Sequence, residues 1–184
     1  MSERDEPLGL RIGKRTLDLL GTTLLLLITA PFLLLAALAI VVEDRGPVLY
    51  RQTRVGRYGV GFELLKLRTM IVGAEYQGAG FAVNAGDPRI TRVGRLLRRL
   101  SFDELPQLLN VLRGDMSLVG PRPMMVEQQD LYPGTAYYAL RPGITGFWQT
   151  SVRNESSFAE RAGFDTDYLR HHATLSDHVS QTCF

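Results

Sequence analysis

The sequence lacks the marks of a disulfide-stabilised or repetitive protein. Its 184 residues include one cysteine, Cys183, which excludes an intrachain disulfide and favours a reducing compartment such as the cytoplasm. There is no internal repeat and no low-complexity segment. A chain of this length suits one domain with an appendage, because domains typically contain about 100 to 200 residues.

An excess of one charge sign is also missing, since the net charge is only +2 at pH 7. The basic residues are nevertheless clustered, and five of them lie within eleven positions: Arg89, Arg92, Arg95, Arg98 and Arg99. Such a cluster favours phosphate groups, nucleic acid or anionic lipid. We disfavour nucleic acid because the apolar stretch Leu19–Val42 would have no role in binding it.

Charge is absent altogether from Leu19–Val42, a run of twenty-four residues. A straight helix of that length extends about 36 Å and could cross a hydrocarbon core of about 30 Å. A secretory signal peptide is disfavoured because its apolar region usually has about 7 to 15 residues and ends at an A-x-A-like site. A buried helix of a soluble core is the weakest alternative. The stretch therefore predicts a membrane-associated helix.

Pro31 lies near the middle of this stretch, where it removes a helical hydrogen bond and clashes with the preceding turn. Basic residues flank both ends, whereas a spanning helix usually has a positive bias at one end. They are Arg11, Lys14 and Arg15 on one side and Arg45, Arg51, Arg54 and Arg57 on the other. We predict a basic flank at 1–15 and a re-entrant helical hairpin at 16–45, broken at Pro31, with both ends cytoplasmic. A kinked spanning helix is the alternative.

Two β-like runs within Val48–Met70 flank the glycine-rich turn Gly56–Gly61 and predict a β-hairpin. Gly73–Pro88 has no sustained period and is interpreted as a loop over the site or a short irregular helix. The arginine-rich segment that follows has apolar residues at helical spacing, namely Ile90, Val93, Leu97 and Leu100. This pattern predicts a basic amphipathic helix that either lies on a membrane surface or packs on the protein's own core.

Ser101–Pro123 reads SFDELPQLLNVLRGDMSLVGPRP and is interpreted as the reactive centre. Ser101 followed by Glu104 ahead of an apolar run is a capping-box pattern for a helix N-terminus. Asp103 and Glu104 would then lie in the first helical turn, where the helix dipole keeps carboxylates ionised and able to attack or to coordinate a metal. The simpler alternative is that the pair only caps and solvates a helix.

Arg122 lies between two prolines after that helix, in a turn that leaves its guanidinium little conformational freedom and suits phosphate recognition. The single tryptophan, Trp148, belongs to the turn-rich segment Leu140–Gln149 and either stacks on a base or lies in the core. The remaining chain is less informative: Phe158–Arg170 is weakly helical, and 171–184 is polar without an apolar stripe.

Taken together, these motifs make the chain resemble the small monotopic phosphoglycosyl transferases, a bacterial sugar-transferase family that starts the assembly of membrane-bound glycans. The resemblance covers Lys14 to Leu169. It rests on the proline-containing apolar helix and on four motifs: Gln52–Gly59, Lys66–Met70, Ser101–Pro123 and Arg141–Gln149. The fold class we expect is α/β, mostly helical with a small β-hairpin, with amphipathic interfacial helices packed on one compact catalytic domain at 46–170.

The resemblance implies a two-step exchange. Asp103, as the family's nucleophilic aspartate, attacks the β-phosphate of a UDP-sugar, expels UMP and holds a covalent phosphosugar, which a polyprenol phosphate such as undecaprenyl phosphate then takes. Asp103 and Glu104 are the implied ligands of a Mg²⁺ cofactor. The implied substrate-binding residues are Lys66, Arg68, Arg98, Pro121, Arg122, Pro123 and Arg141. A carboxylate nucleophile beside arginines and Mg²⁺ is chemically suited to phosphoryl transfer.

The resemblance further implies a bacterial inner (cytoplasmic) membrane location, an active site that faces the cytoplasm, contact with membrane lipid and no nucleic-acid partner; a homo-oligomer is left open. The chain departs from the family in its polar tail at 171–184 and at Val152, where glycine is common. The alternative function is a non-catalytic membrane-surface module that binds partners or lipid.

Overall fold

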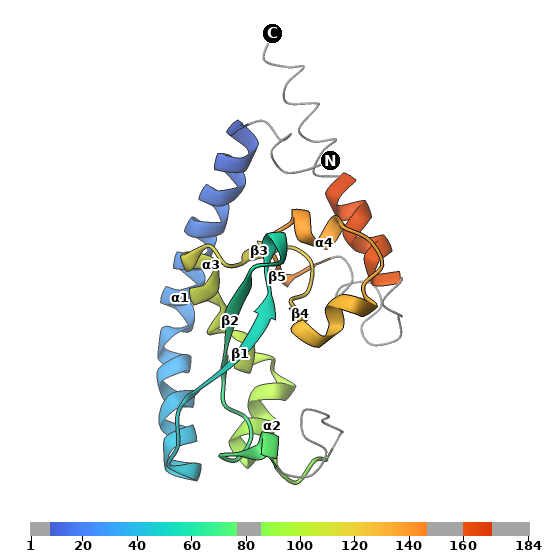
Figure 1. Ribbon diagram of the computed structural model, residues 1–184. Coiled ribbons are helices and arrows are strands. Elements are labelled where there is room, and N and C mark those ends of the chain that lie inside the picture. Colours follow the sequence, from blue (N-terminus) through green and yellow to red (C-terminus); the bar gives the residue numbers. More distant parts are fainter. Residues whose placement is uncertain (1–7, 77–85, 147–159, 171–184) are drawn as a thin grey trace.

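The computed structural model describes residues 8–76, 86–146 and 160–170. This part of the chain is mostly helical with a small sheet (Figure 1), in agreement with the predicted class. The helices are α1 (Leu8–Asp44), α2 (Arg92–Arg99), α3 (Gln107–Arg113) and α4 (Ala136–Ala139), followed by a helix over 160–170. The strands are β1 (Leu49–Val55), β2 (Gly61–Leu67), β3 (Ser117–Val119), β4 (Met124–Met125) and β5 (Gly143–Thr145).

Several predictions concern residues outside this description. They are the first seven residues of the basic flank, the middle of the Gly73–Pro88 loop at 77–85, Trp148, Val152 and the tail at 171–184. The predicted division into a membrane element and a catalytic domain from residue 46 onward stays a prediction.

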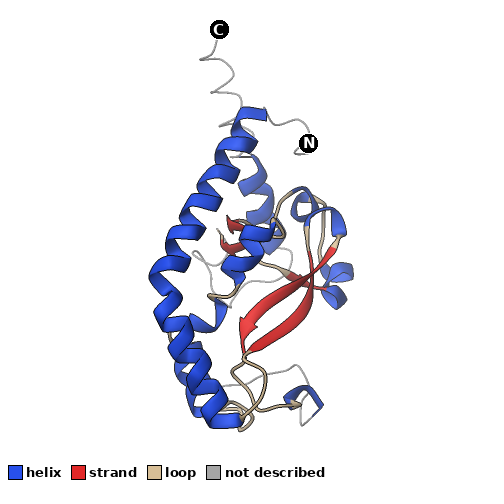
Figure 2. Ribbon diagram, turned by 90° about the vertical axis from the view of Figure 1, so that its left-hand side faces the viewer, coloured by secondary structure: helices blue, strands red, loops and turns tan. Residues whose placement is uncertain are grey.

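The helix α1 is continuous over 37 residues, with Pro31 inside it. Figures 1 and 2 show it running along one side of the molecule without turning back on itself. The structure therefore does not have the predicted break into two arms, and the helix begins at Leu8 rather than at residue 16. Leucine-rich turns on both sides of the proline are strong helix formers, and packing against the domain supports both halves. These terms outweigh the one hydrogen bond that proline removes.

The outer face of α1 is apolar and exposed. Residues 11–44 form a helix long and apolar enough to cross a membrane, with a mean hydropathy of 2.9 in its most apolar window. Only 6% of that window is buried, whereas the core helix of a soluble protein would be mostly covered. Length, composition and exposure thus fit a membrane helix.

Polar contacts fasten the N-terminal half of α1 to the domain. Lys14 Nζ lies 3.3 Å from Asp18 Oδ2 and also donates to the hydroxyl of Ser117 on β3. Asp18 is buried and accepts hydrogen bonds from Ser117 Oγ at 2.8 Å and from the Leu118 amide at 3.1 Å. A buried carboxylate with this many partners fixes the orientation of α1 against β3.

Two carboxylates fasten the C-terminal end of α1 to the same domain. Asp44 Oδ2 accepts a hydrogen bond from Arg68 Nη1 at 2.7 Å. The carboxylate of Glu43 accepts from the amides of Arg92 and Val93 at 2.7 and 2.9 Å, where it satisfies free N–H groups at the start of α2. The domain therefore contacts α1 at both of its ends.

The strands β1 and β2 form the predicted antiparallel hairpin, with Leu49 opposite Leu67. β4 pairs with the other edge of β1, so the strand order is β2–β1–β4, and β3 and β5 form a separate parallel pair. Tyr50 lies opposite Lys66. Because side chains alternate along a strand, Arg54 lies on the same face of the hairpin as Lys66.

The helix α2 begins after its N-cap Thr91, whose side-chain oxygen accepts from the Gly94 amide at 2.9 Å. Leu97 is buried in a cluster with Leu67 of β2 and residues of α1. The neighbouring Leu96, by contrast, is 57% exposed. One face of α2 thus packs on the protein's own core, and membrane contact by the other face stays a prediction.

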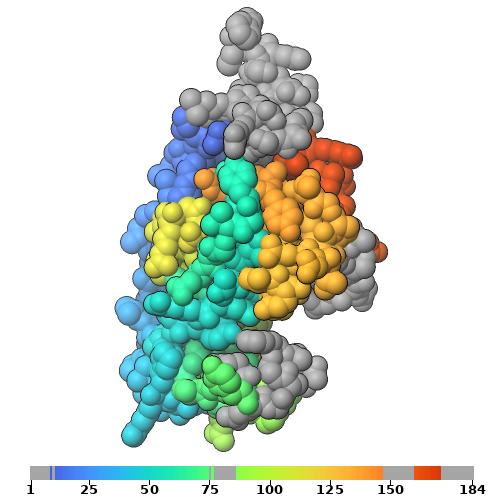
Figure 3. Space-filling model, viewed as in Figure 1, coloured from blue at the N-terminus to red at the C-terminus, as the bar shows by residue number. Residues whose placement is uncertain are grey.

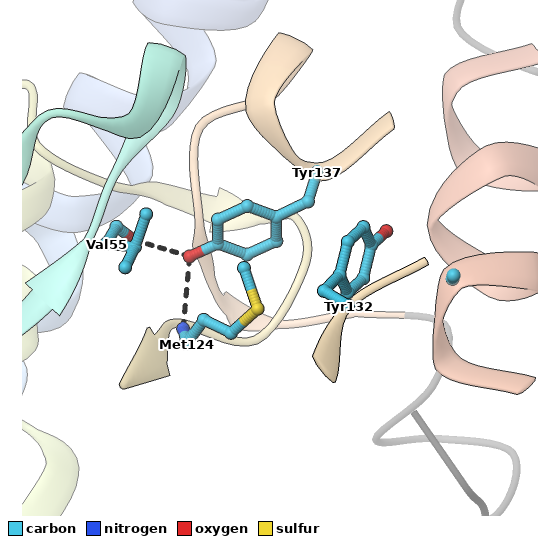
Figure 4. Close-up of a cluster of buried hydrophobic side chains, with 5 residues drawn as sticks. Val55, Met124, Tyr132 and Tyr137 are labelled. Atoms are coloured by element: carbon cyan, nitrogen blue, oxygen red, sulfur yellow. Dashed lines mark hydrogen bonds between the residues drawn. The ribbon is translucent and has the colours of Figure 1, made fainter. Parts of the chain in front are cut away.

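A cluster of tyrosines joins the hairpin to the C-terminal part of the chain. Tyr137 is fully buried, and its hydroxyl donates to the Val55 carbonyl and accepts from the Met124 amide at 3.0 Å (Figure 4). Tyr132 packs on Tyr137 with 5.7 Å between ring centroids and donates to Asp165 Oδ2 at 2.8 Å. The cluster therefore links the end of β1 and the start of β4 to the helix over 160–170.

Candidate active site

Asp103 and Glu104 lie in a short 3-10 turn of their own ahead of α3. Ser101 takes a left-handed backbone conformation, with φ 57°, and makes no capping hydrogen bond through its side chain. α3 begins at Gln107, after Pro106, which has no N–H group and is well suited to start a helix. The predicted capping box is therefore wrong, and the two carboxylates precede the helix instead of lying in its first turn.

Asp103 is 9% exposed as a residue, and burial raises the pKa of its carboxyl group above the usual value. Lys66 opposes the rise, the like charge of Glu104 adds to it, and Arg98 also lowers the pKa. Two cations, Lys66 and Arg98, thus favour the anionic form of Asp103. The sequence had suggested that a helix dipole would do so.

Lys66 of β2 is the nearest cation to the second carboxylate. Its Nζ lies 2.8 Å from Glu104 Oε1, and both side chains are about a quarter exposed, at 23% and 26%. The pair joins residues 38 positions apart and ties the hairpin to the carboxylate turn. Lys66 therefore positions Glu104 next to Asp103, whatever further contact it makes with a substrate.

The position of Arg98 depends on a close approach between α2 and the backbone after β2. Arg98 Nε donates to Thr69 Oγ1 at 2.8 Å. Gly94, one turn earlier, lies so close that a Cβ there would come within 3.0 Å of the Thr69 carbonyl oxygen. The missing side chain of Gly94 allows this packing and brings the Arg98 charge close enough to act on Asp103.

Arg122 is carried by a turn whose carbonyl groups are held from two sides. The Pro121 carbonyl accepts from the Gly143 amide at 2.8 Å. The Arg122 carbonyl accepts from the guanidinium of Arg161 in the helix over 160–170. Both contacts, together with the flanking prolines, restrict the backbone that carries the Arg122 side chain.

A pocket opens between the carboxylate turn, the hairpin and the proline-rich turn. It is lined by Arg54, Leu64, Lys66, Glu104, Gln107, Arg122, Pro123, Gly143 and Ile144. Figure 3 shows the hairpin between α3 and the segment after β4 on one face of the molecule. Four residues predicted for the site therefore meet in one place: Lys66, Glu104, Arg122 and Pro123.

Two polar residues of the pocket, Arg54 and Gln107, were not predicted as site residues. The alternation of side chains along a strand could have placed Arg54 beside Lys66 once the hairpin register was known. Gln107 follows Glu104 by three residues, a spacing that carried no signal because the helix was expected to start earlier.

Asp103 and four predicted substrate residues do not line the pocket, namely Arg68, Arg98, Pro121 and Arg141. Arg68 is ion-paired with Asp44 at the end of α1, at 2.7 Å. Arg141 Nε donates to the Gly114 carbonyl at 3.1 Å, at the end of α3. Their contribution to substrate binding, like that of Arg98, stays a prediction.

The predicted Mg²⁺ site was assessed from its donor atoms. Within the described ranges, no group of three or more His, Cys, Asp or Glu side chains could hold a metal by itself. Asp103 and Glu104 supply carboxylate oxygens, and Mg²⁺ is usually bound by one or two carboxylates together with water and substrate phosphates. The donor set therefore fits Mg²⁺ that arrives with a phosphorylated substrate.

The comparison with known proteins defines the class. The bacterial sugar transferase family matches residues 10–181, and the chain belongs to this family. The predicted membership and the predicted enzyme class, a phosphoglycosyl transferase, are thereby confirmed.

Individual relatives are similar over most of the chain. The exopolysaccharide production protein ExoY of Rhizobium meliloti is 41% identical over 94% of this chain and 83% of its own length. The UDP-glucose:undecaprenyl-phosphate glucose-1-phosphate transferase of Caulobacter vibrioides is 49% identical over 86% of this chain and 63% of its own. The undecaprenyl-phosphate galactose phosphotransferase of Salmonella typhimurium is 38% identical over 91% of this chain and 38% of its own length. The chain therefore spans less than two thirds of the latter two relatives.

Proposed function

We propose that this protein transfers a phosphosugar from a UDP-sugar to a membrane polyprenol phosphate, releases UMP and so starts the assembly of a glycoconjugate. The observation that carries the proposal is the position of Asp103: a buried carboxylate, influenced by Lys66 and Arg98, in the same turn as a residue that lines the pocket with Arg122. The names of the relatives from Caulobacter vibrioides and Salmonella typhimurium support the same reaction.

In the first step, a carboxylate oxygen of Asp103 attacks the β-phosphorus of the UDP-sugar. The bond from that phosphorus to the bridging oxygen breaks, and UMP leaves with the electron pair, so that the phosphosugar is held as an acyl phosphate on Asp103. In the second step, a phosphate oxygen of the polyprenol phosphate attacks the same phosphorus. The carboxylate of Asp103 is released unchanged, and the lipid carries a diphosphate-linked sugar.

The side chains of the pocket serve this chemistry by charge. Arg122 on its restricted turn neutralises phosphoryl oxygens as the attacking carboxylate approaches. Lys66 holds Glu104 in place, and its positive charge partly offsets the burial that raises the pKa of Asp103, so it favours the anionic nucleophile. Asp103 and Glu104 would hold Mg²⁺, which supplies further positive charge to the phosphates when bound.

The contacts of α1 support a location at the inner face of a bacterial cytoplasmic membrane. Lys14 and Asp18 contact the domain near one end of the helix, and Glu43 and Asp44 contact it at the other. A helix that crossed the bilayer would carry one of these polar sets through the hydrocarbon region. We infer that both ends of α1 lie on the cytoplasmic side, with its exposed apolar face against lipid.

Incubation of the purified chain with a UDP-sugar, Mg²⁺ and undecaprenyl phosphate tests the reaction, with UMP release as the readout. UDP-glucose and UDP-galactose come first, because relatives carry the names of glucose and galactose transferases. A chain that releases no UMP from any sugar nucleotide would contradict the proposal. That result would favour the non-catalytic membrane module, with the polar tail at 171–184 as the first segment to exchange.

A further inference from the structure

Gln107 is a buried residue at the start of α3 that lines the pocket. Its residue surface is 3% exposed, and it lines the pocket together with Glu104 and Arg122. Among the residues that the structure describes, none forms a hydrogen bond with its side chain. Its amide atoms are not among the fully enclosed unpartnered atoms of the described residues, so the amide is open to the pocket and can form a hydrogen bond to a ligand there. A ligand in the pocket would supply the missing partner.

Arg54 faces the same pocket from the hairpin. Its Nη2 donates to Gln52 Oε1 at 2.6 Å and its Nη1 to the Pro123 carbonyl at 3.3 Å, whereas Nε is buried without a hydrogen bond. None of the ion pairs between the described residues involves Arg54. Burial lowers the pKa of Arg54, and the nearby charge of Arg122 lowers it further.

Two guanidinium groups thus approach each other at the pocket, and the partners of Arg54 are all neutral. Their like charges repel each other, and an anion that binds between them would reduce this repulsion. A phosphoryl group is the anion that fits best, because its oxygens accept from planar guanidinium donors and from an amide N–H together.

We propose that Arg54 and Gln107, together with Arg122, bind a phosphoryl group of the substrate in this pocket. Arg54 and Gln107 were not predicted as site residues from the sequence. This inference rests on the proposed function, since it names further contacts of the same site. The phosphoryl group comes either from the diphosphate of the nucleotide donor or from the phosphate of the lipid acceptor. Separate probes distinguish these two sources.

The first experiment measures the affinity of the full chain, in lipid nanodiscs, for UDP and for a short-chain prenyl phosphate. The test variants are Arg54→Lys, which keeps the charge but not the planar fork, and Gln107→Leu, which keeps the size but not the amide. Each lost hydrogen bond to a charged group should weaken binding of the affected probe by about tenfold or more. Thermal unfolding midpoints verify that both variants are folded.

Matched controls come from the same types of residue outside the pocket. Arg51 lies on the same strand as Arg54 but is 63% exposed and paired with Glu63 at 3.5 Å. Gln129 makes a hydrogen bond to the Val126 carbonyl at 3.3 Å and does not line the pocket. Arg51→Lys and Gln129→Leu should therefore bind both probes within about twofold of the unmodified chain, as expected for surface substitutions.

Weaker binding of UDP alone would assign the phosphoryl site to the donor, and weaker binding of the prenyl phosphate alone would assign it to the acceptor. Unchanged affinity for both probes in both folded test variants would overturn the inference. The proposed function is judged separately by UMP release from the unmodified chain. If that chain releases UMP while the variants bind normally, only the inference fails; if it releases none, the proposed function fails, whatever the binding data show.

Discussion

At the scale of single residues, Asp103 has to combine burial with a negative charge, and these two properties oppose each other. The Asp103→Asn substitution keeps the size of the side chain but removes the anionic nucleophile. We therefore expect transfer to fall to a few per cent or less, measured as initial rates of UMP release. The unfolding midpoint should stay close to that of the unmodified chain, because Asp103 forms no ion pair with another residue in the described part of the chain.

The companion change is Glu104→Gln, which removes the charge that pairs with Lys66. If Glu104 helps to hold Mg²⁺, the variant should need more Mg²⁺ for half-maximal activity. A normal Mg²⁺ dependence of Glu104→Gln would contradict that role. Full activity of Asp103→Asn would contradict the assignment of Asp103 as the nucleophile.

Asp165 provides a prediction about stability and pH. Burial raises its pKa to about 6, while the hydrogen bond from Tyr132 and the charge of Arg161 act in the opposite direction. An acid whose pKa is higher in the folded protein stabilises it below the unfolded pKa, and this contribution is lost as pH rises through the folded value. The contribution should therefore be present near pH 4 and lost by pH 7.

The measurement compares the free energy of unfolding of the unmodified chain with that of Asp165→Asn from pH 4 to pH 7. Asparagine does not titrate, so the difference isolates Asp165 from the other carboxylates. Over this range the unmodified chain should lose up to about 3 kcal/mol relative to the variant, from a shift of about two pKa units. A difference that stays constant with pH, or that changes in the opposite direction, would show that the burial of Asp165 does not control its titration.

At the scale of elements, the packing of α2 against Thr69 should depend on Gly94. A methyl group at this position would overlap the Thr69 carbonyl, so Gly94→Ala should destabilise the fold by about 1 to 3 kcal/mol, as overpacking usually does. It should also displace Arg98 and lower the rate of UMP release. The control is Gly163→Ala in the helix over 160–170, where no atom lies within 4 Å of an added Cβ. There alanine should be neutral or slightly stabilising, and equal effects of the two substitutions would contradict the packing argument.

The elements differ in how far local sequence determined them. The β-hairpin was predictable because the turn chemistry of Gly56–Gly61 and the flanking β-like runs agree with the pairing that forms. The start of α3 was not, because Ser101 and Glu104 satisfy a capping pattern that Pro106 overrides by beginning the helix later. The continuity of α1 through Pro31 was not predictable either, because the contacts that hold both halves of the helix come from distant segments.

At the scale of the whole molecule, the site is assembled from segments far apart in the chain. The motifs identified Lys66, Glu104 and Arg122, but their meeting in one pocket depends on the hairpin register and on the support of the proline-rich turn. Gln107 and Arg54 could not be predicted for the same reason. A buried amide and an unpaired guanidinium nitrogen become visible only when every neighbour has been placed.

The contacts at both ends of α1 lead to a prediction of membrane topology. Single cysteines are introduced at Gly9, before the helix contacts the domain, and at Pro47, just after its end, in a background with Cys183→Ser. A cysteine at the exposed Glu127 marks the side on which the domain lies. All three should react with a membrane-impermeant maleimide in inverted vesicles and be protected in intact spheroplasts.

The physical reason is that one domain cannot contact both ends of a helix that has a bilayer between them. A spanning arrangement would have to break either the Lys14–Asp18–Ser117 contacts or the carboxylate contacts of Glu43 and Asp44, and would move charged side chains across the hydrocarbon core at a cost of about 2.5 to 3.5 kcal/mol each on insertion scales. Pro31→Leu restores one hydrogen bond within α1 but changes none of these contacts, so it should leave the labelling pattern unaltered. Labelling of Gly9→Cys from the outside, with Glu127→Cys labelled only from the inside, would show that α1 spans the membrane and that its contacts with the domain are not made there.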